Sequence, residues 1–132
     1  MRAFLGIPIP GQLAEELSNR ISSLRKASPG ITWVRPENYH ITMLFLGEID
    51  DAEVARVSAA IDSLHAEGGA EAVFGELGQF PPKGFPRVVY AGLDKGREFC
   101  EGVFQRLSVA LPGYSQDRGY AVSYTHLRAH ET

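Results

Sequence analysis

Residues 33–48 of this 132-residue chain read WVRPENYHITMLFLGE, with a strand pattern at their centre. From Tyr39 to Leu46 the stretch contains no Gly or Pro and is rich in aromatic and branched side chains, which is typical of a buried or half-buried strand. Pro36 to Asn38 is a turn signal directly before it, and Gly47 follows it. The sequence therefore predicts a strand at 39–46 that is entered through a tight turn.

Alternation along this strand predicts two unlike faces, because successive side chains of a strand point to opposite sides. The expected core face consists of Tyr39, Ile41, Met43 and Phe45, and the other face of His40, Thr42, Leu44 and Leu46. His40 and Thr42 place a titratable ring nitrogen beside a hydroxyl donor. On their own, a His and a Thr two residues apart are more often ordinary strand residues.

The rest of the chain continues in helical and strand periodicities. Strands are expected at 2–9, 31–34, 72–80 and 87–93, and helices at 12–26, 51–66 and 96–111. Asp50 or Asp51 is expected to cap the second helix, and His65 to lie exposed near its C-terminal end. With one further strand after the third helix, this order predicts an α+β fold with helices packed on antiparallel sheet.

Composition bounds the functional classes. The chain is of single-domain size, and its net charge of −3 excludes a general basic surface for long nucleic acid. The single cysteine, Cys100, fits a reducing compartment. No apolar run reaches the length of a membrane span and the N-terminus lacks a signal-peptide pattern. We therefore expect a cytoplasmic monomer without a membrane partner.

Residues 33–48 resemble the first signature of the bacterial and archaeal RNA 2',3'-cyclic phosphodiesterases, also called 2'-5' RNA ligases. These belong to the two-histidine (2H) phosphoesterase superfamily, which carries two His-x-Thr/Ser-x motifs. The first is His40-Ile41-Thr42-Met43 here, and the match extends over Trp33, Pro36, Asn38, Phe45, Leu46, Gly47 and Glu48. The resemblance implies two βαββ-like lobes with antiparallel sheets around a central cleft, and in this chain the second lobe is incomplete.

The resemblance also implies roles for particular residues. His40 would be the general acid that protonates the departing 3'-oxygen, and Thr42 would bind phosphate. Arg118 and Arg87 are candidate phosphate neighbours, and each is about as readily a surface charge. The implied reaction is the metal-independent hydrolysis of RNA ends or cyclic nucleotides to 2'-phosphomonoesters, without a cofactor and with 2'-5' ligation as its reverse. The alternative is a non-catalytic RNA-end binding module that retains only the first half-site.

The second motif is missing where the family has it. Family members follow the third helix with a segment like Asp-Arg-x-Phe-x-Pro-His-x-Thr-Leu, whereas residues 117–125 read DRGYAVSYT, so that Ser123 stands where the second His belongs and Thr125 where the Thr belongs. Residues 122–132, VSYTHLRAHET, resemble the translation of a transposon-end sequencing adapter. We therefore expect a truncated 2H phosphoesterase domain at 1–121 and a non-native tail at 122–132. His126 and His130-Glu131-Thr132 are expected to be chance matches within that tail.

Overall fold

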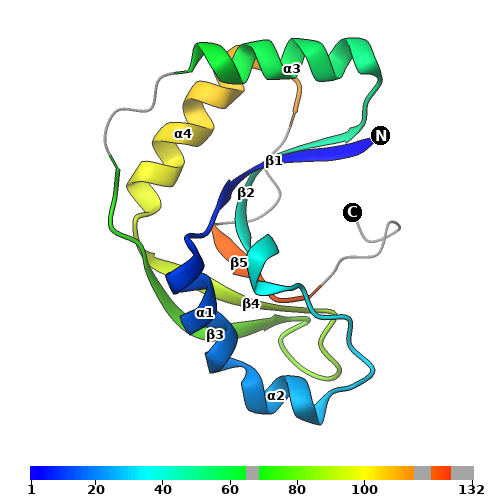
Figure 1. The fold of residues 1–132 in the computed structure, drawn as a ribbon, viewed down its shortest axis with the longest axis vertical. Helices are drawn as coiled ribbons and strands as arrows, with labels where there is room; N and C mark the ends of the chain where they lie inside the picture. Colours follow the sequence, from blue (N-terminus) through cyan, green and yellow to red (C-terminus); the bar gives the residue numbers. More distant parts are fainter. Residues whose placement is uncertain (65–68, 115–119, 126–132) are drawn as a thin grey trace.

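The structure, a computed structural model, describes residues 1–64, 69–114 and 120–125 (Figure 1). Within these residues the strands are β1 (Arg2–Pro8), β2 (His40–Glu48), β3 (Val73–Phe80), β4 (Val88–Lys95) and β5 (Ala121–Ser123). The helices are α1 (Gly11–Arg20), α2 (Ser22–Ala27), α3 (Asp51–Ser63) and α4 (Arg97–Ala110), with a short 3-10 turn, η1 (Pro36–Asn38). All these strands join one sheet in the order β1-β2-β5-β4-β3, and every neighbouring pair is antiparallel. The predicted α+β class with antiparallel sheet is confirmed.

The hydrophobic core lies on one face of this sheet. Alternate residues of the central strands are buried there, among them Ile41 of β2, Val122 of β5 and Ala91 of β4. Leu17 of α1 and Leu107 of α4 belong to the same core cluster. Along β1 the residues of the other face are exposed, at Arg2, Phe4, Gly6 and Pro8. We call this second face, which also carries His40, the open face.

The predicted alternation of β2 is correct only as far as Met43. Leu5 pairs with Leu44 and Gly6 with Thr42, so Met43 is an extra residue in β2, a β-bulge. The bulge reverses the alternation, and as a result Leu44 and Leu46 are buried while Phe45 is only partly buried. A second register shift lies near Gly47, whose φ of 68° is a left-handed conformation that glycine adopts without strain.

The helix predicted at 12–26 is interrupted at Ile21. This residue separates α1 from α2, and its side chain is fully buried. Its backbone N–H donates to the carbonyl of Ser18, a tighter turn than the α-helical bond to the fourth residue back. After the interruption, Leu24 of α2 is 38% exposed. The prediction of one continuous helix at 12–26 was therefore wrong at this point.

The strand predicted at 31–34 does not form. Its backbone is joined to the residues after β5 by a bridge between Trp33 and Thr125 and by a hydrogen bond of 2.8 Å from the Val34 N–H to the Tyr124 carbonyl. Pro29 and Gly30 precede this segment and Pro36 follows it, and such residues oppose a longer ladder.

The strand expected after the third helix does form, and it occupies the middle of the sheet. β5 lies between β2 and β4 (Figure 1). Val122, Tyr124 and Thr125, which belong to the expected tail, are buried. The non-native origin of residues 122–132 stays a prediction about the gene. Among the described helices, none combines the length and the apolar character needed to cross a membrane.

Candidate active site on the open face

The imidazole of His40 is fixed at the start of β2. η1 turns the chain into the strand, and Nδ1 of His40 lies 2.8 Å from the carbonyl oxygen of Asn38. Because a carbonyl oxygen can only accept, Nδ1 is the donor and carries a proton. The proton that His40 can gain or lose is therefore at Nε2, which is the arrangement that a histidine in acid–base chemistry needs.

Two neighbours on β1 set the position of the ring. Phe4 stacks on His40, with 4.5 Å between ring centroids and 24° between ring planes. Gly6 leaves room for this pair, because a Cβ at position 6 would lie 3.2 Å from His40 Cδ2 and 3.3 Å from Phe4 Cε2. Neither Phe4 nor Gly6 was predicted from the sequence as a site residue. The sequence does show that Phe4, Gly6 and Pro8 alternate along one strand and so share a face. It does not show the register that pairs Pro8 with His40 and brings that face to the imidazole.

The strand register places Ser123 across from His40. Ile41 of β2 pairs with Val122 of β5 in an antiparallel ladder, so the adjoining positions 40 and 123 oppose each other. Directly opposed residues of neighbouring strands share a face of the sheet. Thr42 is two residues from His40 and lies before the bulge, so it shares this face too. The structure thus brings together His40, Thr42 and Ser123.

The remaining predicted residues are placed less centrally. Arg87 is exposed and lies one residue before β4. Arg118 lies outside the described residues, as do His65, His126 and residues 130–132. Thr125 is buried, and its hydroxyl lies 3.3 Å from the N–H of Val89, from which it accepts a hydrogen bond. Ser123 donates from its hydroxyl to the Thr125 carbonyl at 3.0 Å.

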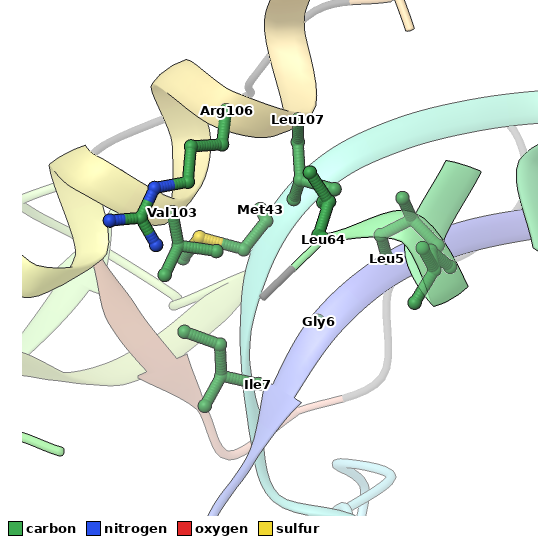
Figure 2. Close-up of a pocket in the computed structure, with 9 residues that line it drawn as sticks. Leu5, Gly6, Ile7, Met43, Leu64, Val103, Arg106 and Leu107 are labelled. Atoms are coloured by element: carbon green, nitrogen blue, oxygen red, sulfur yellow. The ribbon is translucent and has the colours of Figure 1, made fainter. Parts of the chain in front are cut away.

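A cavity of about 250 Å³ lies on the opposite, helix-covered side of β1 and β2 (Figure 2). It is lined by Leu5, Gly6, Ile7, Met43, Ile61, Leu64, Val103, Arg106 and Leu107. Figure 2 shows the apolar side chains of both strands pointing toward those of the helical layer. Since Met43 alternates with Thr42 along β2, this cavity is separated by the sheet from the His40 side chain. It is a partly open apolar pocket between the sheet and the helices and not part of the candidate site.

No cluster of three or more His, Cys, Asp or Glu side chains suited to a metal ion occurs in the part of the chain that the structure describes. The polar groups that the register gathers around His40 are its imidazole and the hydroxyls of Thr42 and Ser123. Hydroxyls donate to phosphate oxygens, and an imidazole moves a proton to or from an oxygen. This set of groups suits the binding and protonation of a phosphate ester.

Comparison with known proteins agrees with this chemistry. Residues 7–90 match the model of the LigT like Phosphoesterase family. An RNA 2',3'-cyclic phosphodiesterase of Archaeoglobus fulgidus is 29% identical over 95% of this chain and 70% of its own length. The protein of the same name from Bacillus subtilis is 32% identical over 66% of this chain, which spans 48% of that relative.

Solved structures share the fold. The crystal structure of TT0787 from Thermus thermophilus has a TM-score of 0.80 at 23% identity, over 98% of this chain and 75% of that one. Apo LigT of E. coli has a TM-score of 0.72 at 19% identity, over 95% of this chain and 71% of that one. The family match covers more than half of the sequence and includes β2 with His40 and Thr42. This chain belongs to the LigT-like phosphoesterase family.

Proposed function

We propose that the protein opens RNA 2',3'-cyclic phosphate ends to 2'-phosphomonoesters without a metal ion. The observation that carries the proposal is the position of the His40 imidazole on the open face. The Asn38 carbonyl holds Nδ1 and the Phe4 ring stacks on the imidazole, which leaves Nε2 to exchange a proton with the substrate. The names of the Archaeoglobus and Bacillus relatives support the choice of substrate.

The proposed reaction uses His40 as the general acid. The oxygen of a water molecule attacks phosphorus, and the bond between phosphorus and the ribose 3'-oxygen breaks. Nε2–H of His40 gives its proton to that 3'-oxygen, while the Thr42 hydroxyl donates to a non-bridging oxygen. The attacking water must lose a proton to a base, and in this mechanism the base belongs across from His40.

Ser123 occupies the position across from His40, and a serine hydroxyl is not a base at neutral pH. A positioned acid or base group contributes roughly 10²–10⁴-fold to a rate. The chain with Ser123 is therefore expected to turn over cyclic phosphates slowly. The same observation favours a second candidate function, a non-catalytic module that binds RNA ends through the His40 half-site.

Ser123→His tests the proposal directly. It should raise the hydrolysis of a 2',3'-cyclic nucleotide in the presence of EDTA by roughly 10²–10⁴-fold, and adding His40→Ala should remove the gain. Ser123→Ala is the matched control, because it removes the hydroxyl without adding an imidazole. If Ser123→His folds but is no faster than Ser123→Ala, the binding module becomes the better account.

The proposal extends to the substrate, the compartment and the oligomeric state. The substrates are RNA ends or cyclic nucleotides. The protein acts in the cytoplasm as a monomer. Microscopic reversibility allows 2'-5' ligation of RNA at the same site. Arg87 and Arg118 remain proposed phosphate neighbours.

A further inference from the structure

One row of residues crosses the open face from β2 to β3. His40 opposes position 123 of β5, Ser123 pairs with Tyr90 of β4, and Tyr90 pairs with Gly78 of β3. Opposed residues share a face, so the Tyr90 side chain lies on the same side of the sheet as His40. Two strand spacings, or about 9 to 10 Å, separate the backbone positions of His40 and Tyr90. A single ribonucleotide can bridge this separation, because its base and its 2',3'-phosphate lie at different edges of the ribose.

The Tyr90 ring lies over Gly78. A Cβ at position 78 would fall 2.6 Å from both Cε2 and the hydroxyl oxygen of Tyr90, and closer still to Cζ. The absence of a side chain at Gly78 thus lets the outer part of the ring lie down on the neighbouring strand. Tyr90 is not fully buried, so a ring laid against the sheet still presents surface to the open face.

We propose that Tyr90, lying on Gly78, is the stacking platform for the terminal base of the RNA end whose phosphate is bound at His40; this inference rests on the proposed function. Stacking on an aromatic ring tolerates every base, because each base has a π face. It also supplies affinity without cationic side chains, which suits a chain with a net charge of −3.

The experiment compares two ligands that the protein does not consume. Adenosine 2'-monophosphate carries both base and phosphate, while methyl riboside 2-monophosphate has the same phosphate and no base. Tyr90→Leu keeps an apolar side chain but removes the ring. It should raise the Kd for the adenosine compound by about 5- to 150-fold, the range found when an aromatic partner of a base is removed. The Kd for the base-free compound should not change.

Two further variants isolate the contribution of the aromatic ring. Tyr90→Phe keeps the ring and should bind both ligands as the parent does. Gly78→Ala should weaken adenosine 2'-monophosphate binding in the same direction as Tyr90→Leu, because its Cβ displaces the ring. Combined with Tyr90→Leu it should have little additional effect, since both changes act through the same ring.

The outcomes distinguish this inference from the proposed function. If Tyr90→Leu leaves both Kd values unchanged, or if Tyr90→Phe loses as much affinity as Tyr90→Leu, the stacking platform is excluded while phosphate binding at His40 stands. If the parent binds neither ligand, or if His40→Ala changes neither Kd, the proposed function fails and the inference with it.

Discussion

The orientation of His40 depends on three neighbours that differ in kind. The Asn38 carbonyl fixes the donor nitrogen, the Phe4 ring covers one face of the imidazole, and Gly6 supplies space. Asn38 contributes its main-chain carbonyl and Gly6 the absence of a side chain, so side-chain substitutions at these positions test their contributions only indirectly. Phe4 contributes through its side chain and can be tested by substitution.

Phe4→Leu should loosen the imidazole without disturbing the core, because Phe4 is 47% exposed. An aromatic pair contributes about 0.5–1.5 kcal/mol beyond the area it buries, so the free energy of unfolding in urea should fall by about that amount. The ring-current shift of the His40 carbon-bound protons, measured by NMR, should disappear. Phe4→Tyr keeps the ring and is the control. An unchanged His40 spectrum in Phe4→Leu would contradict the stacked arrangement.

For individual residues, the sequence predicts that His40 and Thr42 lie on the same face of the strand, because alternation over two residues needs no tertiary information. It does not predict Phe4 or Tyr90 as residues of the same face. Both depend on strand register across the sheet, and both are far from His40 along the chain.

At the scale of elements, the N-terminus of α3 is an independent test of the helix boundaries. The prediction that Asp50 or Asp51 caps this helix is confirmed for Asp50, which accepts from the Glu53 N–H at 2.8 Å. Asp50→Ala should lower the free energy of unfolding by roughly 0.5–2 kcal/mol, and Asp50→Asn by much less, because asparagine is an equally good cap. If Asp50→Ala and Asp50→Asn lower the free energy of unfolding in urea equally, the charge and not the cap hydrogen bond stabilises the helix.

The contact between α3 and the segment after α4 should depend on pH. Hydrogen bonds from Arg56 and then from Tyr114 lower the pKa of Glu53 from 4.5 to about 2. A carboxylate with a lowered pKa stabilises the fold fully above its ordinary pKa and progressively less as the pH falls toward the folded value.

The parent should therefore lose stability between pH 4.5 and pH 2 by an amount that Glu53→Gln does not lose. The urea midpoint measured at about pH 6 and about pH 3 checks this. Tyr114→Phe should reduce the difference only partly, because Arg56 remains. A Glu53→Gln chain with the parent's pH dependence would show that other carboxyls dominate.

The boundaries of elements were predictable where local signals agree and not where packing decides. The bounds of β1 and α4 and the cap of α3 are set by sequence patterns that each lie within or beside the element itself, and the predictions for them are close to the structure. The break at Ile21 follows from the burial of that side chain, and the bulge at Met43 from its pairing with β1. Neither interaction is visible in a periodicity.

For the whole molecule, β5 is the element on which the sheet depends. It joins the β1-β2 pair to the β4-β3 pair. Directly after it, Tyr124 packs edge-on against Tyr39 at 5.3 Å and donates from its hydroxyl to the Leu17 carbonyl of α1 at 2.8 Å. Burial, and then the neighbouring Tyr39, raise the pKa of Tyr124 to about 12, so this hydroxyl remains a donor at neutral pH. Residues 122–125 therefore have a structural role whatever their origin.

The expected origin of the tail has its own test. Resequencing the locus from an independent library should replace VSYTHLRAHET by a continuation with a His-x-Thr strand. In the register of β5, that histidine would oppose His40. Recovery of the same tail would end the adapter proposal.

A chain that stops at Ala121 should not fold. It lacks Val122 and Tyr124, which are fully buried, and both β2 and β4 would lose their common neighbour. Strand edges left unpaired in this way also favour aggregation. We expect no cooperative unfolding transition in urea, monitored by near-ultraviolet circular dichroism.

Tyr124→Phe in the full chain is the graded comparison for this truncation. It removes only the hydrogen bond to Leu17 and should cost about 1 kcal/mol with cooperativity retained. If the chain ending at Ala121 instead unfolds cooperatively at the parent's urea midpoint, β5 is dispensable. The placement of Ser123 opposite His40 would then lose its support, because that placement depends on β5 pairing with β2.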